Sequence, residues 1–166
     1  MKLALEKFTF DDFPLYYSLV SNETVMKGIS YGALGQEEAE IRFGKLLYNS
    51  NLHKNFGFYK FLDLENNDFL GFGKLEIEQL GDEQAELGYI IVPEHWRKGL
   101  GTKLSKLLVE KAIEDGLVHT LYAIIDPNNE ASRKILKKCG FVFKGYQNLD
   151  GIQVEVLERK LFNQVR

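Results

Sequence analysis

Residues 97–102, which read R-K-G-L-G-T, have the residue types and spacing of an anion-binding loop. The loop follows an apolar run at 84–92, and from Gly99 it opens a predicted helix whose apolar residues recur at helical spacing. Glycines at 99 and 101 remove side chains where a ligand must approach, and the unpaired N–H groups of a first helical turn suit a diphosphate. Arg97 and Lys98 add positive charge. The same glycines would also let the helix pack tightly on a sheet, so both interpretations stay open.

Two other phosphate-binding loops are excluded by the same stretch of sequence. A dinucleotide fingerprint that starts at Gly99 requires a third glycine where the chain has Leu104. A P-loop requires Gly-Lys followed by Ser or Thr, whereas Lys103 follows Thr102 and precedes Leu104. The loop therefore supports neither nucleotide class.

A second segment with turn and helix-capping residues lies further along the chain. It reads D-P-N-N-E-A-S over residues 126–132 and is followed by Gly140-Phe141. Asn128 or Asn129 is a suitable N-cap, and a glycine at 140 is a suitable helix stop. The spacing predicts a helix that carries Ser132 in its first turn.

The two segments together resemble the acetyl-CoA motifs of the GNAT superfamily of N-acetyltransferases, usually written Q/R-x-x-G-x-G/A and N-x-x-A/S with a closing G-F. The P-x-N-x-x-S spacing is similar to the branch that acetylates ribosomal-protein N-termini (Rim type), polyamines and related amines. The resemblance spans residues 3–162. It implies an acyltransferase that moves an acetyl group from acetyl-CoA to a primary amine, either a protein N-terminus or a small molecule, by direct attack in a ternary complex.

The resemblance places acetyl-CoA along the strand before the loop and on the loop itself. It assigns cofactor binding to Ile90, Ile91, Val92, Arg97, Lys98, Gly99, Leu100, Gly101, Thr102 and Asn129. The alternative for residues 90–92 is a buried strand of the kind that any mixed sheet contains. The loop departs from the family pattern at Trp96, which stands where Gln or Arg is usual. Backbone N–H groups are therefore expected to bind most of the diphosphate, with Trp96 packed beneath the loop.

Glu86 and Ser132 are the candidate catalytic residues. An amine that resembles the lysine side chain has a pKa of about 10.4 and must lose a proton before it attacks. Glu86 begins the central strand and is the candidate base, acting directly or through water, with an outward-facing strand residue as its alternative role. Leu136 stands where many GNAT enzymes carry the Tyr that protonates the departing thiolate, and Ser132 is the substitute that this branch suggests. The alternative for Ser132 is a hydroxyl that bonds within its own helical turn.

The resemblance also implies where an amine acceptor would bind. Residues 21–35 and 148–152 are expected to form its walls, and Tyr31 is the candidate substrate-binding residue, with turn packing as its alternative. The missing Tyr at position 136 leaves a second hypothesis, a catalytically weak acetyl-CoA-binding sensor or interaction module. Cys139 is expected in the core and not as a nucleophile, because no His is near it in sequence and it falls on an apolar helix face.

The elements that must position these residues follow an irregular order, β-α-α-β-β-β-α-β-α-β-β. Strands are predicted at 3–8, 56–63, 69–80, 84–92, 119–126, 141–149 and 152–161, and helices from Asp11 or Asp12, from about Gln36, from Gly99 to near Gly116, and from Asn128 or Asn129 to Gly140. This order predicts an α/β (α+β mixed) fold, and the resemblance implies a mostly antiparallel central sheet of about seven strands flanked by four helices. A bulge or close backbone approach is expected near Gly73, where the apolar alternation changes face.

The composition is that of one globular domain spanning residues 1–166, with 45% hydrophobic and 27% charged residues. The net charge of -3 gives no general attraction to nucleic acid or to an anionic membrane, and no apolar run is long enough for a membrane span. Cys139 is the single cysteine and the 3 His are scattered, so neither a disulfide nor a metal site is expected. These features favour a cytoplasmic protein. Homodimers are common in the family that the chain resembles.

Overall fold

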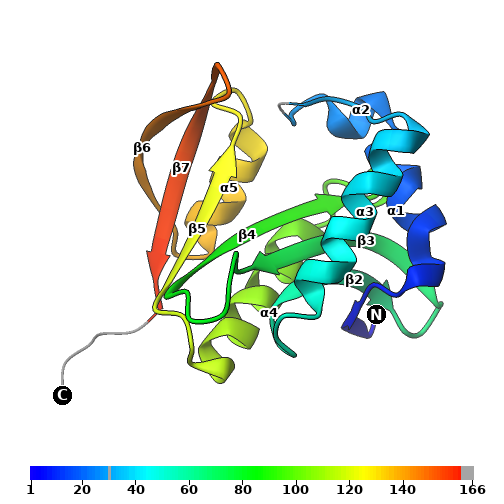
Figure 1. Ribbon diagram of the computed structural model, residues 1–166, viewed down its shortest axis with the longest axis horizontal. Coiled ribbons are helices and arrows are strands. Elements are labelled where there is room, and N and C mark those ends of the chain that lie inside the picture. Colours follow the sequence, from blue (N-terminus) through cyan, green and yellow to red (C-terminus); the bar gives the residue numbers. More distant parts are fainter. Residues whose placement is uncertain (30, 162–166) are drawn as a thin grey trace.

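A computed structural model describes residues 1–29 and 31–161, and in this part of the chain the strands form one 7-stranded sheet. The sheet order is β1-β2-β3-β4-β5-β7-β6 (Figure 1). The strands are β1 (Leu3–Lys7), β2 (Gly57–Asp63), β3 (Asp68–Glu76), β4 (Gln84–Ile91), β5 (Thr120–Ile125), β6 (Val142–Leu149) and β7 (Ile152–Lys160). All neighbouring strands are antiparallel except β4 and β5, which are parallel. The predicted mixed, mostly antiparallel sheet is confirmed.

The described residues form five α-helices, one more than the four that were predicted. They are α1 (Phe13–Val20), α2 (Glu23–Met26), α3 (Gln36–Ser50), α4 (Leu100–Asp115) and α5 (Glu130–Lys138), with short 3-10 helices η1 (Phe10–Asp12) and η2 (Pro93–His95). The prediction of four helices missed α2, a single turn that is too short to show helical periodicity. Its N-terminus is capped by the Asn22 side chain, which accepts the Val25 N–H at 3.0 Å.

Two hydrophobic cores lie on opposite faces of the sheet. One core joins α4 and the Leu136 side chain of α5 to strand residues such as Leu87 and Phe61. The other joins α1 and α3 to strand residues, and its centre is an aromatic cluster in which the Tyr16 and Phe72 rings lie 5.6 Å apart. In Figure 1, α3 lies in front of the strands and α4 behind them. The sheet is therefore covered on both faces.

The central feature of the sheet is the separation of β4 from β5. The two parallel strands are paired only where Gln84, Ala85 and Glu86 face the stretch 120–122. Beyond this stretch β4 continues along β3, whereas β5 continues along β7, and the two strands diverge (Figure 1). The gap opens at the carboxyl ends of the two parallel strands, which is where open α/β sheets bind ligands.

The predicted irregularity in β3 occurs three residues earlier than expected. The register between β2 and β3 shifts so that Phe61 faces Gly71 and Leu62 faces Phe69, which leaves Leu70 as the extra residue. A close approach does exist at Gly73, where an added Cβ would lie 2.8 Å from Leu108 Cδ1. The predicted strand 69–80 is also four residues too long, since β3 ends at Glu76.

An ion pair attaches α5 to β7. Arg133 Nη2 lies 2.7 Å from Glu155 Oε1, and the same nitrogen donates to the Pro127 carbonyl at 2.5 Å. The hydrogen bond from Arg133 lowers the pKa of the Glu155 carboxyl, whose side chain is only 2% exposed. This contact fixes the start of α5 relative to β7.

In the described residues, none of the helices has the length and apolar character that a membrane crossing requires.

We expect Arg133→Leu to lower the melting temperature by roughly 5 °C at neutral pH, because it leaves a buried carboxylate unpaired. Since the Glu155 pKa is lowered on folding, the pair stabilises the protein above about pH 4.5 and loses this effect as the pH falls through the folded value. The difference in melting temperature between wild type and variant should therefore become smaller in acid, as measured by thermal unfolding between pH 3.5 and 7.5.

The matched control is Lys134→Leu, an exposed position on the same helix, which should leave the melting temperature unchanged. The double variant Arg133→Leu/Glu155→Leu should recover part of the loss because no charge is then left buried. A double variant that is as unstable as the single one would contradict this assignment.

Candidate active site

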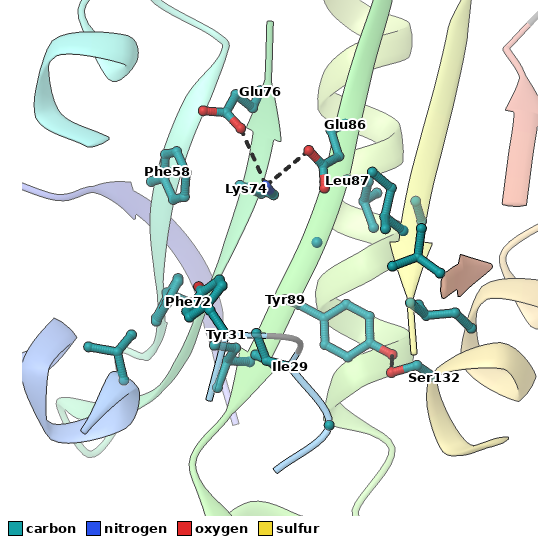
Figure 2. Close-up of a pocket in the computed structure, with 18 of the residues that line it drawn as sticks. Ile29, Tyr31, Phe58, Phe72, Lys74, Glu76, Glu86, Leu87, Tyr89 and Ser132 are labelled. Carbon is teal, nitrogen blue, oxygen red and sulfur yellow. Dashed lines mark hydrogen bonds and ion pairs between the residues drawn. The ribbon is translucent and has the colours of Figure 1, made fainter. Parts of the chain in front are cut away.

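A cleft of about 630 Å³ occupies the gap between β4 and β5. Its walls come from the ends of these two strands, from the start of α5, from residues near Ile29 and Tyr31, and from the aromatic core under α1 and α3 (Figure 2). The predicted acceptor segments both reach it, since Tyr31 and Leu149 line the cleft. Ser30, within the first segment, lies outside the described residues.

Backbone groups of β4 face this cleft at alternate residues. Val92 N–H donates to the Leu70 carbonyl of β3 at 2.9 Å, and the Ile90 carbonyl points at Gly71 so closely that a Cβ there would collide with it. In an antiparallel ladder the residues between direct their N–H and C=O groups to the other side, so those of Tyr89 and Ile91 face the gap. Of the three strand residues assigned to acetyl-CoA, Ile90 lines the cleft, and only Ile91 directs its backbone groups toward the gap, where its carbonyl is already bonded to Trp96.

Trp96 anchors the loop that follows β4. Its indole N–H donates to the Ile91 carbonyl at 2.7 Å, and its side chain remains half exposed. The expectation that Trp96 packs beneath the loop is therefore only partly right. The residue fixes the end of β4 by a hydrogen bond and leaves much of its ring on the surface.

The R-K-G-L-G-T loop presents free N–H groups at the start of α4. Lys103 N–H is the first to bond within the helix, to the Gly99 carbonyl at 3.1 Å. Among the described residues, the N–H groups of the three preceding residues (Leu100, Gly101 and Thr102) have no acceptor. Arg97 and Gly99 are both left-handed, with φ of 63 and 76°, and the side chains of Arg97 and Lys98 are exposed. These N–H groups and the helix dipole fit an anionic diphosphate.

The two glycines of the loop have different roles. An added Cβ at Gly99 would meet nothing within 4 Å, so glycine is favoured there by its positive φ alone. An added Cβ at Gly101 would lie 2.9 Å from Ile135 Cδ1 and 3.3 Å from Tyr89 Cε2. The packing interpretation thus holds for Gly101, and the conformational one for Gly99.

A lysine flanked by two carboxylates lies on the α1–α3 face of the cleft. Lys74 Nζ is 3.0 Å from Glu86 Oε1 and 3.3 Å from Glu76 Oε1 (Figure 2). Burial opposes the ammonium charge, but the two carboxylates outweigh this effect and raise the pKa of Lys74. Its stem crosses Gly88, where an added Cβ would lie 3.2 Å from Lys74 Cε. Glu86 therefore faces the cleft side of the sheet as one member of a charged cluster, and no sequence motif marks Lys74.

Tyr31 lies on the same side of the cleft. Its side chain is half exposed, and the Arg42 guanidinium carbon stacks 4.0 Å from its ring centre. Arg42 is in turn bound to Glu38 at 3.0 Å. Tyr31 is therefore both a lining residue and part of a packed contact with α3.

The start of α5 forms the opposite wall. Asn129 Oδ1 accepts the Ser132 N–H at 3.1 Å as an N-cap, and Asn129 Nδ2 points toward Gly28. The Tyr89 hydroxyl donates to Ser132 Oγ at 3.2 Å (Figure 2). Burial raises the pKa of Tyr89 to about 12. Leu136, one turn beyond Ser132, is buried and lines the same cleft.

Tyr89 was not among the residues predicted for the site. The stretch E-L-G-Y at residues 86–89 is typical of a strand, but only the packing of α5 beside β4 brings the Tyr89 hydroxyl to Ser132. The predicted alternative for Ser132, a hydroxyl bonded within its own turn, is not what the structure shows. Cys139 is buried, as expected, and burial raises the pKa of its thiol.

Across residues 1–29 and 31–161, no three His, Cys, Asp or Glu side chains are grouped so as to hold a metal ion.

The comparisons with known proteins agree with this fold. The sequence profile described as "Acetyltransferase (GNAT) domain" matches residues 2–142. The uncharacterized N-acetyltransferase YoaA of Bacillus subtilis is 29% identical over 157 residues, which cover 85% of this chain and 76% of that protein.

Two solved structures share the fold along almost the whole chain. Spermidine N-acetyltransferase from Vibrio cholerae, in complex with CoA and spermine, aligns with a TM-score of 0.79 at 20% identity and covers 96% of both chains. RimL, a ribosomal alpha-N-protein acetyltransferase in complex with coenzyme A, aligns with a TM-score of 0.80 at 16% identity and covers 97% of this chain and 95% of its own. With the profile match over most of its length, this chain belongs to the acetyltransferase (GNAT) family.

Proposed function

We propose that this protein transfers an acetyl group from acetyl-CoA to a primary amine by direct attack in a ternary complex. The observation that carries the proposal is the position of two chemically different groups near the two ends of β4. Unbonded N–H groups lie at the start of α4, beyond the carboxyl end of β4, and the cluster of Lys74, Glu76 and Glu86 lines the cleft near the start of this strand. A thioester bound between them would meet an amine that enters from the α1–α3 face.

The chain's own residues can hold the nucleotide half of acetyl-CoA by charge and by hydrogen bonds. The free N–H groups of Leu100, Gly101 and Thr102 would bind the diphosphate, with Arg97 and Lys98 adding positive charge. The backbone groups of Tyr89 and the N–H of Ile91 would hydrogen-bond the pantetheine amides, since the Ile91 carbonyl is bonded to Trp96. When bound, acetyl-CoA supplies the activated acetyl group.

Deprotonation of the amine is the step that the acidic cluster would serve. An alkylammonium has a pKa of about 10.4, so a base must take its proton at neutral pH. Glu86 is the proposed base, directly or through water, and Glu76 is the second carboxylate within reach of the same cluster. Lys74 stays charged throughout the neutral range because its pKa is raised, and it holds both carboxylates in place.

The lining favours an acceptor with one amine beside an apolar group. Aromatic side chains line this part of the cleft, namely Tyr16, Phe58 and Phe72 of the α1–α3 core and the half-exposed Tyr31. Among the described residues that line the cleft, the positive and negative charges are equal in number. The basic residues are Arg42, Lys45 and Lys74, and the acidic ones are Glu76, Glu86 and Asp126. A polycation would need several unpaired carboxylates, whereas two of these are already bound to Lys74. A peptide N-terminus with an apolar first residue fits this lining better than a polyamine does.

We expect CoA release from acetyl-CoA to be saturable with N-terminal peptides whose first residue is apolar. Their kcat/KM should exceed that of spermidine by roughly tenfold, since burying one apolar group in the aromatic wall gives a difference of this order. The assay compares peptides, polyamines, amino acids and aminoglycosides. Spermidine or an aminoglycoside as the best acceptor would overturn the proposed acceptor class. Intact acetyl-CoA binding without transfer to any amine would favour the sensor hypothesis.

A matched pair of variants tests the anion site. Gly99→Asn and Gly99→Asp have nearly the same shape, and both side chains tolerate a left-handed backbone. We expect the aspartate variant to raise the KM for acetyl-CoA roughly tenfold above that of the asparagine variant, because it puts a negative charge beside the diphosphate. Initial-rate kinetics and calorimetric titration with CoA would measure this. Equal constants for the two variants would exclude the loop as the diphosphate site.

The proposed base is tested by Glu86→Gln with Glu76→Gln as its matched control. We expect Glu86→Gln to lower kcat/KM by roughly a hundredfold and Glu76→Gln to have a much smaller effect. Lys74→Met should move the acidic limb of the pH–rate profile to higher pH, because two neighbouring carboxylates without a cation favour protonation of each other. A larger loss for Glu76→Gln would assign the base to Glu76. An unmoved acidic limb would remove the cluster from the deprotonation step.

A further inference from the structure

We propose that Tyr89 and Ser132 form a two-hydroxyl relay that protonates the leaving sulfur of CoA, with Tyr89 acting through Ser132. The inference rests on the proposed acetyl transfer and extends it to a residue that the sequence motifs do not mark. Position 136 of α5 holds a leucine. A phenol nevertheless reaches the same helix from the opposite wall of the cleft, because the Tyr89 side chain of β4 extends to Ser132 (Figure 2).

The Tyr89 ring is held in place on two sides. It packs over Gly101, where an added Cβ would lie 3.3 Å from Tyr89 Cε2. Its hydroxyl oxygen ends 3.2 Å from Ser132 Oγ. The ring therefore spans the distance between the start of α4 and the start of α5, and its hydroxyl has little freedom to point elsewhere.

Ser132 is oriented by its own backbone. The Ser132 N–H donates to the Asn129 side chain, which fixes the first turn of α5, and Oγ accepts a hydrogen bond from the Tyr89 hydroxyl. Within the described residues the Ser132 hydroxyl hydrogen has no acceptor, and Ser132 lines the cleft. That hydrogen is therefore available to a group bound in the cleft between β4 and β5.

The protonation states suit a donor. Burial raises the pKa of Tyr89 to about 12, so its phenol is neutral at physiological pH. A phenol is also a much stronger acid than an aliphatic alcohol, so Tyr89 donates to Ser132 and makes the serine hydroxyl a better donor in turn.

The proton movements balance as follows in the step that releases CoA. As the carbon–sulfur bond breaks, its electron pair stays on sulfur, and Ser132 gives its hydroxyl proton to that sulfur. Tyr89 passes its phenolic proton to Ser132 Oγ, and the phenolate regains a proton from water, which returns the one lost by the amine. The overall reaction converts one thioester and one amine to one amide and one thiol.

The test uses the thiol of bound CoA, so it does not depend on knowing the acceptor. The thiolate absorbance of the CoA complex is titrated against pH, with the complex of desulfo-CoA subtracted to remove the signal of Cys139. Hydrogen bonds to a thiolate lower its pKa, so the bound thiol should titrate about one pH unit lower in the wild type than in Tyr89→Phe or Ser132→Ala. The double variant should titrate like either single variant, because the relay acts as one unit.

Tyr59→Phe is the matched control. Tyr59 is also buried, its pKa is also raised to about 12, and its hydroxyl bonds the Asn55 carbonyl away from the cleft. This variant should leave the thiol titration unchanged even if it lowers stability. With an active acceptor, Tyr89→Phe should lower kcat roughly 10- to 100-fold and leave the KM for acetyl-CoA unchanged.

The outcomes separate the relay from the proposed function. Identical thiol titrations in wild type and Tyr89→Phe would overturn the relay, while acetyl transfer by both would leave the proposed function standing. If the titration of the bound thiol shifts in Ser132→Ala but not in Tyr89→Phe, Tyr89 takes no part in the relay. Failure of the wild type to bind CoA would overturn both proposals. The expected shift, without transfer to any amine in the panel, would support the relay and count against the proposed acetyl transfer.

Discussion

The separation of two parallel strands is the constraint on which this structure depends. β4 and β5 share only the pairing of 84–86 with 120–122, and each then follows its antiparallel neighbour. On one side, the missing side chain of Gly71 lets β3 approach the Ile90 carbonyl, which keeps β4 along β3. On the other side, the Arg133–Glu155 pair ties α5 to β7 and so to β5. The cleft exists because β4 pairs with β3, and β5 pairs with β7, well beyond the short stretch in which β4 and β5 pair with each other.

The divergence also distributes the chemistry over both faces of the sheet. Side chains alternate along β4, so Glu86 points toward α1 and α3 while Tyr89 points toward α4 and α5. A ligand lying in the gap is reached by both. In the proposed reaction the charged cluster and the hydroxyl pair would therefore act on opposite sides of one ligand without competing for space, although Glu86 and Tyr89 are only three positions apart in the sequence.

Much of this arrangement could be predicted from the sequence because its signals are local. Strand and helix order followed from periodicity, and the anion loop followed from two glycines at the start of an amphipathic helix. What failed depends on partners far away in the chain. A bulge or a close approach was expected at Gly73 because a face change can be seen in one strand. The close approach is there, but the bulge lies at Leu70, where the register with β2 sets its position. Lys74 and Tyr89 were missed for the same reason, since each acquires its role only from the element opposite.

Gly101 links two parts of the site that the sequence would treat as separate. Its missing side chain lets α4 approach the sheet, and the space that it leaves is filled by the ring of Tyr89 and by Ile135. The location of the helix that offers its N–H groups to an anion and the location of the phenol are thus fixed by one contact. Mechanically, the two cannot drift independently, because any displacement of α4 is transmitted to the tyrosine and through it to α5. A single aromatic ring thereby sets the spacing between the start of α4 and the start of α5.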